Sequence, residues 1–189
     1  MRDYQNIERY LNEFSEQIYE QPPDDKHTEW AKWVIDHWVS VLVGCKNVLD
    51  VGCGQGFCKP LFERFGIAWT GVTLGYDAVV CQDANLPVLN EDFSFLSAKN
   101  ESYDLIFSRH SLEHSPMPLL TLMEWYRVSK QWLCVIFPNP EFWTVKGKNH
   151  YSVMYKDQSL HILETAGWRV IWENISKEEY RFMCEKIRK

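Results

Sequence analysis

The sequence lacks the features of several common protein classes. No stretch approaches the roughly 20 consecutive apolar residues that span a bilayer, and the N-terminus has no apolar core of the kind found in a signal peptide. The formal net charge of −6 argues against a surface built to bind nucleic acid. The six cysteines include no C-x-x-C pair, and several lie in apolar runs where a free thiol packs as a small hydrophobe. We therefore expect a reduced, cytoplasmic protein that does not associate with a membrane, and the composition disfavours nucleic acid as its partner.

The sequence does have enough apolar content for one full core. Its 189 residues are 46% hydrophobic, which suits one domain and is short for two. Apolar residues recur at three- and four-residue steps in 2–20 and in 28–43, which predicts two amphipathic helices, the second with Thr28 as its N-cap. We expect a single domain over 1–189, with a helical lid at 1–44 and an α/β core at 45–189.

The stretch 48–57, VLDVGCGQGF, is the most informative part of the chain. A short apolar strand pattern surrounds Asp50, and glycine then recurs at every second position. Glycine accepts a positive φ and lets a ligand approach the main chain, so a cofactor can lie across this turn. The dinucleotide fingerprint G-x-G-x-x-G would need glycine where the chain has Phe57, so a nicotinamide or flavin site is disfavoured.

The spacing G-x-G-x-G, with an acid two residues before the first glycine, resembles motif I of the class I S-adenosylmethionine (SAM) dependent methyltransferases. In that family the loop wraps the methionine end of SAM. The resemblance implies that this part of the cofactor contacts Asp50, Gly52, Cys53, Gly54, Gly56 and Phe57. The alternative is a glycine-rich turn that binds no ligand.

A second stretch, YDLIFSRHSLEH at 103–114, resembles the signature F-D-x-[IV]-x-S-x-x-x-L-E-H of small-molecule methyltransferases. It implies a fourth strand whose end places Ser108 and Arg109 beside the cofactor. The later LMEWYRVSK is similar to the family's L-x-E-x-x-R-V-L-K before strand five. The resemblance implies a Rossmann-like α/β fold, with helices on both faces of a seven-stranded sheet in the order 3-2-1-4-5-7-6 whose last strand is antiparallel.

The next strand ends depart from the family pattern. Strand two, IAWTGV, is followed by Thr73 where the family has a ribose-binding acid, so we expect either Thr73 or Asp77 at the ribose. The apolar run VVCQDA at 79–84 predicts strand three, with almost no helix before it. The residues that follow, QDANLPV, resemble the family's motif after strand three, and the resemblance implies contacts to adenine from Asp83, Ala84, Asn85 and Leu86. The alternative for Asp83 is a solvated loop aspartate.

Two histidines close to the end of strand four raise the question of a metal. His110-x-x-Glu113-His114 matches a zinc-protease pattern in which two histidines share one helix. Pro116 and Pro118 follow at once and would end or kink such a helix. The sequence therefore predicts no metal site here.

The resemblance predicts SN2 transfer of the SAM methyl group to an acceptor. SAM is already activated by its positive sulfur, so the protein mainly aligns acceptor and methyl and excludes water. A hydroxyl acceptor would need a general base, for which His110 and His150 are the candidates. Cations and hydroxyls near His150 favour either a solvated surface loop or recognition of a small acceptor that carries a phosphate or a carboxylate; they are Lys146, Lys148, Tyr151, Tyr155 and Lys156. Two alternatives remain open: a SAM- or nucleoside-binding module without catalysis, and a nucleic-acid methyltransferase.

Overall fold

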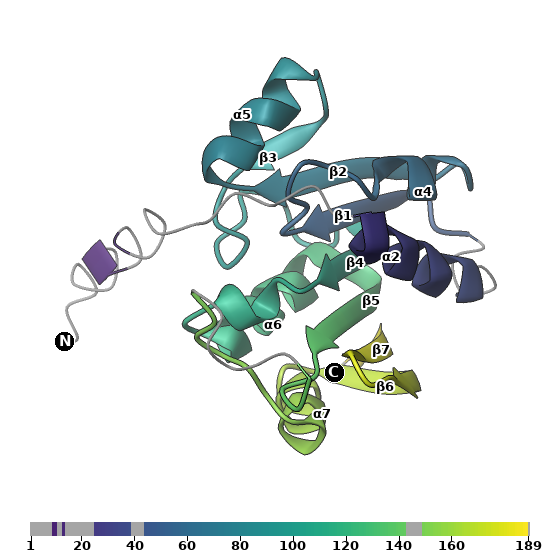
Figure 1. Cartoon of the computed structure of the whole chain (residues 1–189), viewed down its shortest axis with the longest axis vertical. Coiled ribbons are helices and arrows are strands. Elements are labelled where there is room, and N and C mark those ends of the chain that lie inside the picture. Colours follow the sequence, from purple (N-terminus) through teal and green to yellow (C-terminus); the bar gives the residue numbers. More distant parts are fainter. Residues whose placement is uncertain (1–8, 11–12, 14–24, 39–43, 143–148, 189) are drawn as a thin grey trace.

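The computed structural model describes residues 9–10, 13, 25–38, 44–142 and 149–188, which include a seven-stranded sheet with helices on both faces (Figure 1). The strands are β1 (Asn47–Val51), β2 (Ala68–Thr73), β3 (Val88–Asn90), β4 (Tyr103–Arg109), β5 (Ser129–Pro138), β6 (Trp168–Ile175) and β7 (Glu179–Lys186). The helices are α2 (Asp25–His37), α4 (Lys59–Glu63), α5 (Gly75–Asp83), the 3-10 turn η1 (Leu112–His114), α6 (Pro118–Val128) and α7 (Lys156–Thr165).

The strand order is β3-β2-β1-β4-β5-β7-β6. Strand β7 runs antiparallel to both β5 and β6, and the other neighbouring strands are parallel. This is the predicted Rossmann-like sheet, and the prediction is confirmed. Because parallel strands end at one edge of a sheet, the residues that follow β1, β2 and β4 converge there, where ligands bind in folds of this type.

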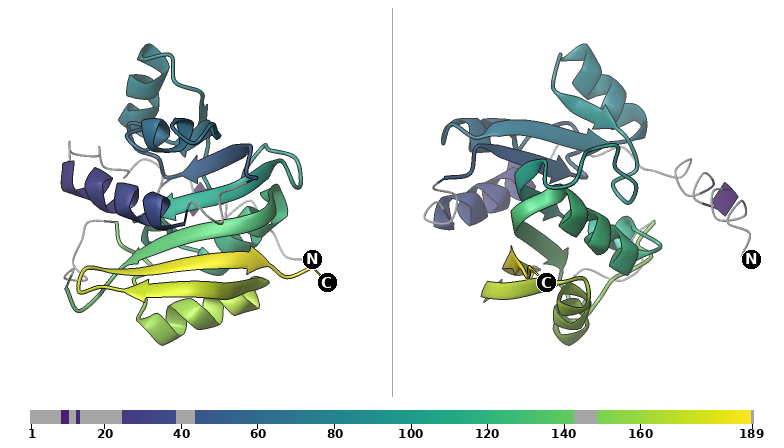
Figure 2. Two further views of the ribbon diagram at one scale, coloured as in Figure 1. Left: turned by 90° about the vertical axis from the view of Figure 1, so that its right-hand side faces the viewer. Right: turned by 180° about the vertical axis from the view of Figure 1, so that it is seen from behind.

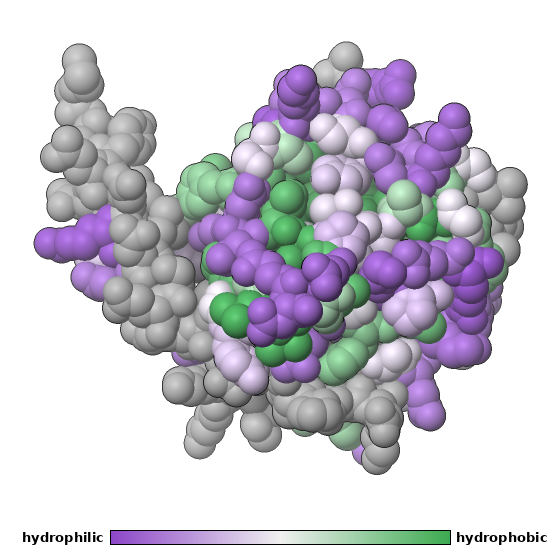
Figure 3. All heavy atoms as spheres, turned by 90° about the horizontal axis from the view of Figure 1, so that it is seen from above, coloured by the Kyte–Doolittle hydropathy of each residue, from purple (hydrophilic) through white to green (hydrophobic). Residues whose placement is uncertain are grey.

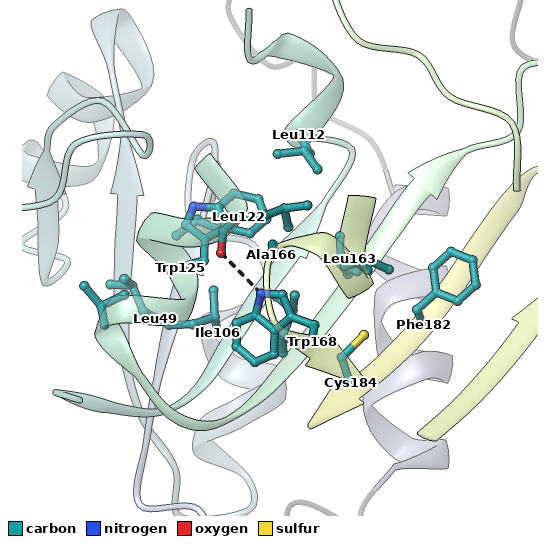
Figure 4. Packing of buried hydrophobic residues seen from close by; sticks show 14 of the residues in the cluster. Leu49, Ile106, Leu112, Leu122, Trp125, Leu163, Ala166, Trp168, Phe182 and Cys184 are labelled. Atoms are coloured by element: carbon teal, nitrogen blue, oxygen red, sulfur yellow. Dashed lines mark hydrogen bonds between the residues drawn. The ribbon is translucent and has the colours of Figure 1, made fainter. Parts of the chain in front are cut away.

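An apolar layer covers each face of the sheet. On one face α2 and α4 contribute Val34 and Phe62, which pack with Phe107 of β4. On the other face α6 and α7 pack against the sheet, and the indole of Trp168 donates a hydrogen bond to the carbonyl of Leu122 at 3.2 Å (Figure 4). At the edge of the sheet α7 lies beside β6, and β6 and β7 run along each other (Figure 2). The strand ends are therefore held from both sides by packed helices.

The prediction for strand three was wrong. The run 79–84 lies largely in helix α5, and β3 follows it at Val88–Asn90. Ala78 and Cys81 are buried while Val79 is 49% exposed, which is the three-residue spacing of a helix face. A short apolar run does not by itself distinguish a strand from a helix.

Seen from the α5 end, the surface carries hydrophilic and apolar residues side by side (Figure 3).

The N-terminal helices are described only in part. The helix predicted at 2–20 lies almost wholly outside the described residues, as do residues 39–43 of the second helix. The second helix begins at Asp25, so Thr28 lies inside it and the predicted N-cap was wrong. In the described part of the chain we find no helix with the length and hydropathy of a membrane span.

Candidate functional site

A small cavity of about 40 Å³ lies where β1 and β4 end, against α2. Its lining combines an acid, an arginine, the first glycine of the turn and two phenylalanines: Thr28, Asp50, Gly52, Cys53, Phe57, Cys58, Phe107 and Arg109. Five of these were predicted from the sequence as cofactor contacts. Thr28, Cys58 and Phe107 were not, although Phe107 alternates with Ser108 along a recognisable strand.

Asp50 is a buried carboxylate with a neutral hydrogen-bond donor. The residue is only 3% exposed, and its Oδ2 accepts a hydrogen bond from Nε1 of Trp69 at 2.9 Å. Burial raises the pKa of Asp50 to about 7, and the Trp69 hydrogen bond offsets part of this rise. A carboxylate in this position would gain stability from a cationic group of a ligand in the cavity.

The glycine turn packs closely against neighbouring segments of the chain. Gly52, Gly54 and Gly56 have φ of 72°, 53° and 80°, a region that favours glycine. A Cβ on Gly52 would lie 2.2 Å from Oγ of Ser111, and a Cβ on Gly56 would lie 2.8 Å from Cδ1 of Leu86. The glycines therefore let the turn pack against neighbouring segments, in addition to leaving main chain open beside the cavity.

The end of β2 brings two predicted ribose contacts close to the turn. Thr73 and Asp77 are both buried, and Asp77 lies in the first turn of α5. Gln55 of the glycine turn donates from Nε2 to Oδ1 of Asp77 at 3.1 Å. Asp77 is thus placed beside the turn and at the positive end of a helix, where its negative charge is stabilised.

The residues predicted at adenine do not follow a strand. Asp83 is the last residue of α5, and it is exposed together with Ala84 and Asn85. Leu86 instead packs against Gly56 of the glycine turn. The acids that do follow β3 are Glu91 and Asp92, which were missed because the strand was placed too early.

Asp92 is a half-buried acid in the turn after β3. Its Oδ1 accepts a hydrogen bond from the backbone N–H of Ser94 at 2.8 Å. The next residue, Phe93, packs edge-on against Trp125 with ring centroids 6.0 Å apart. This fixes the turn at the same edge of the sheet as the ends of β1 and β2.

The end of β4 carries a buried ionic cluster that the sequence did not reveal. Glu179, at the start of β7, is fully buried and accepts hydrogen bonds from Nη2 of Arg109 at 2.7 Å and Nε of Arg181 at 2.8 Å. Nε2 of His110 lies 3.1 Å from Oε1 of the same carboxylate. Burial alone would raise the pKa of Glu179, but the His110 hydrogen bond and the charges of Arg109, His110 and Arg181 hold it at about 2. Strand pairing brings these residues together, because β5 lies between β4 and β7 and pairs with both.

Helix α2 covers this cluster with aromatic rings. The guanidinium of Arg109 lies over Trp30 at 5.8 Å from the ring centroid, and that of Arg181 lies over Trp33 at 5.0 Å. Both arginines are therefore held between a carboxylate and an indole. Ser108 lies on the opposite face of β4 from Arg109, since successive strand residues alternate. It is fully buried, and its hydroxyl has no hydrogen-bond partner within the described chain.

The other predicted base, His150, lies against His114 with ring centroids 4.9 Å apart. Burial lowers the pKa of His114 to about 4 and also lowers that of His150. Glu113 beside them is 1% exposed, and burial raises its pKa to about 8. Of the predicted acceptor-binding cations, Lys146 and Lys148 lie outside the described residues. Lys156 is paired with Glu173 at 2.7 Å and so faces a carboxylate of its own chain.

Comparison with known proteins relates part of the chain to one family. Residues 49–132 match the family model of a methyltransferase domain. The match begins in β1 and ends in β5, so it includes the glycine turn, Asp50 and Arg109, in a sheet with the class I strand order. This segment is therefore similar to a methyltransferase domain, and the sheet has the strand order of the class I S-adenosylmethionine-dependent methyltransferases. The matched segment leaves out His150 and Glu179.

The curated relatives of this chain differ in their named chemistry. Norajmaline N-methyltransferase from Rauvolfia serpentina is 34% identical over 79 residues, which cover 36% of this chain and 27% of that protein. Ubiquinone biosynthesis O-methyltransferase from Coxiella burnetii (strain Dugway 5J108-111) is 26% identical over 118 residues, which cover 58% of this chain and 47% of that protein. The chain thus spans less than half the length of these curated relatives.

A solved structure shares the fold of this chain over almost its whole length. Magnesium protoporphyrin IX methyltransferase from Synechocystis PCC 6803, crystallised with bound SAH, superposes with a TM-score of 0.67. The match covers 98% of this chain and 97% of that one at 16% sequence identity. At this identity the likeness shows a common fold.

Proposed function

We propose that the chain binds SAM at the ends of β1, β2 and β3 and transfers its methyl group to a small-molecule acceptor. The observation that carries this proposal is the cavity between Asp50 and Arg109, beside the glycine turn. An α-amino carboxylate, such as the methionine end of SAM, needs an anion for its ammonium and a cation for its carboxylate. Asp50 is a buried anion whose present donor is neutral, and Arg109, which shares its charge with Glu179, is the cation on the same cavity.

The remaining parts of SAM have matching neighbours along the same edge. We assign the ribose hydroxyls to Thr73 and Asp77, which lie at the end of β2 and in the first turn of α5. We assign the adenine amino group to Asp92, in place of Asp83. The carboxylates of Asp77 and Asp92 are acceptors, as the hydroxyls of a ribose and the amino group of adenine require.

The chain then has to position an acceptor and remove its proton where the acceptor is a hydroxyl. When bound, SAM supplies a methyl group already activated by the sulfonium charge. Nε2 of His110 lies 3.1 Å from Oε1 of Glu179, and a carboxylate can only accept, so we assign the ring proton to Nε2 and the uptake of a proton to Nδ1. His110 also has a φ of 47°, a strained conformation that is common at functional sites. We therefore propose His110, oriented by Glu179, as the general base.

Calorimetry with SAM and with its demethylated product SAH tests binding first. The variant Asp50→Asn keeps the shape of the side chain and removes its charge, and it should bind at least about 10-fold more weakly, as expected when one charged hydrogen bond is lost. Asp83→Asn, an exposed position on α5, is the matched control and should bind as the wild type does. If neither ligand binds the wild type, the proposal fails.

A screen with SAM that carries a tritiated methyl group, over fractions of small molecules and nucleic acids, tests transfer. We expect label in a small-molecule fraction, and His110→Gln should lower the rate about 100-fold or more while leaving SAH affinity unchanged, if the acceptor is a hydroxyl. Binding without transfer to any fraction would favour a SAM-binding module. Transfer to RNA or DNA, with the salt dependence that phosphate contacts impose, would favour a nucleic-acid methyltransferase.

A further inference from the structure

Three side chains from two segments converge beside η1, away from the Asp50 cavity lining. Glu113 and His114 come from η1, and His150 comes from the segment that follows β5. One ligand atom from each lies within 4.8 Å of those of the others. The two segments are also joined by their backbones, because the N–H groups of Tyr151 and Ser152 both donate to the carbonyl of Glu113, at 2.7 and 3.0 Å.

Glu113 is the unusual member of this group. The residue is 1% exposed, and its Oε2 has no hydrogen-bond partner in the part of the chain that the structure describes. A buried carboxylate oxygen without a donor costs free energy, so native proteins pair such an atom with a donor, a water or a metal ion. The neighbours of Glu113 in the cluster are imidazole rings, which bind metals in their neutral form.

The contacts of the two histidines suit metal binding. Nδ1 of His114 lies 2.9 Å from the carbonyl oxygen of Asn149, and because a carbonyl only accepts, Nδ1 carries the proton. The lone pair of the ring is then on Nε2. A backbone carbonyl that orients a histidine through its other nitrogen is the usual outer contact of a metal-binding histidine. The His150 ring meets that of His114 at 73°, so the two rings approach one another edge to face.

We propose that Glu113, His114 and His150 form a binding site for a divalent transition-metal ion such as Zn²⁺. Two imidazole nitrogens and one carboxylate oxygen are a ligand set that Zn²⁺ accepts with a position left for a water or another oxygen ligand. Mg²⁺ and Ca²⁺ prefer oxygen ligands throughout, and this cluster offers one carboxylate.

This site differs from the one that the sequence pattern suggested. The helical H-x-x-E-H arrangement does not form, since η1 has three residues and His110 is directed to Glu179. The third ligand comes from His150, far along the chain. The ion would clamp the segment that begins at Asn149 onto η1, close behind the end of β4, and this inference does not depend on the proposed methyl transfer.

Metal binding can be measured directly on the full chain. After treatment with a chelator, the protein should develop the visible d–d absorption of low-coordinate Co²⁺ when CoCl₂ is added, and ZnCl₂ should abolish it. His150→Ala removes a half-buried ring and should weaken Zn²⁺ binding by at least about 100-fold, because even the outer contacts of a metal ligand are worth about 10- to 100-fold. His161→Ala, on the exposed face of α7, is the matched control and should bind as the wild type does. MgCl₂ should not compete.

A second variant, Glu113→Gln, keeps the volume of the buried side chain and should also lose the cobalt spectrum while the circular dichroism of the protein is retained. If Glu113→Gln does not fold, the Zn²⁺ affinities of His150→Ala and His161→Ala test the proposal. The proposal is overturned if the wild type gives no cobalt spectrum, or if both histidine variants bind Zn²⁺ with the affinity of the wild type. SAH calorimetry on the same samples reports the Asp50 cavity separately.

Discussion

Replacing Glu179 by glutamine should destabilise the protein strongly, although the shape of the side chain is conserved. The carboxylate is fully buried and accepts from Arg109 and Arg181, whose side chains are themselves only 9% and 10% exposed. Glutamine would leave two buried guanidinium groups without their counter-charge. Removing one partner of a buried ionic network costs about 3 to 5 kcal/mol.

The pKa of Glu179 gives an independent magnitude. It lies at about 2 in the folded protein against an ordinary value of 4.5, and a shift of this size corresponds to about 3 kcal/mol of folding free energy. Because the folded pKa is depressed, this stability is complete above about pH 4.5 and is lost as the pH falls towards 2. At pH 3 less than half of it should remain. In a chain of this length the loss at pH 7 corresponds to about 6 to 12 °C in Tm.

Urea unfolding, followed by tryptophan fluorescence at pH 7 and at pH 3, tests this reasoning. The difference between wild type and Glu179→Gln should be about 3 kcal/mol at pH 7 and about 1 kcal/mol at pH 3. Glu173→Gln breaks the exposed pair with Lys156 and is the control, which should cost less than about 1 kcal/mol. A difference for Glu179→Gln that is as small as the control's, or that does not shrink on acidification, would refute the assignment of a buried ionic cluster.

Asp92→Ala should weaken SAH binding in calorimetry, while Asp83→Ala should not; the reverse result would restore the placement of adenine at the end of α5. Gly52→Ala should destabilise the fold by about 2 to 4 kcal/mol, because it adds a left-handed alanine and a Cβ 2.2 Å from Oγ of Ser111. Ser111→Gly in the same chain should restore part of this in denaturant unfolding, and no recovery would mean that the contact is not the cause. Because burial holds the pKa of Asp50 at about 7, above its ordinary 3.8, its charge opposes folding increasingly as the pH rises between these values. Asp50→Asn should therefore be more stable than the wild type at pH 8, on the order of 2 to 4 kcal/mol without ligand, and equal Tm values would contradict the shift.

Much of the fold could be predicted because its signals are local. The glycine turn after β1 and the stretch from β4 to Glu113 each carry strand pattern and turn chemistry within a dozen residues, and they fix the strand order by resemblance. Strand three failed because Val79, Val80 and Cys81 form a short apolar run that suits a buried strand as well as a helix.

The site was predictable only where it lies on one segment. Asp50 and Arg109 belong to recognisable stretches, and the structure brings them to one cavity. Glu179 could not be found, because its contact with Arg109 depends on the register of an antiparallel strand inserted far from β4 in sequence. The same holds for His150 and Glu113, which no local spacing relates.

The last strand that the structure describes is an interior strand of the sheet, since β7 lies between β5 and β6. A nascent chain that has just completed β6 lacks the strand with which β6 pairs, and Arg109 lacks the Glu179 carboxylate, because both Glu179 and Arg181 belong to β7. We expect protease resistance of growing-length fragments to appear in a single step when β7 becomes available, and not to accumulate strand by strand.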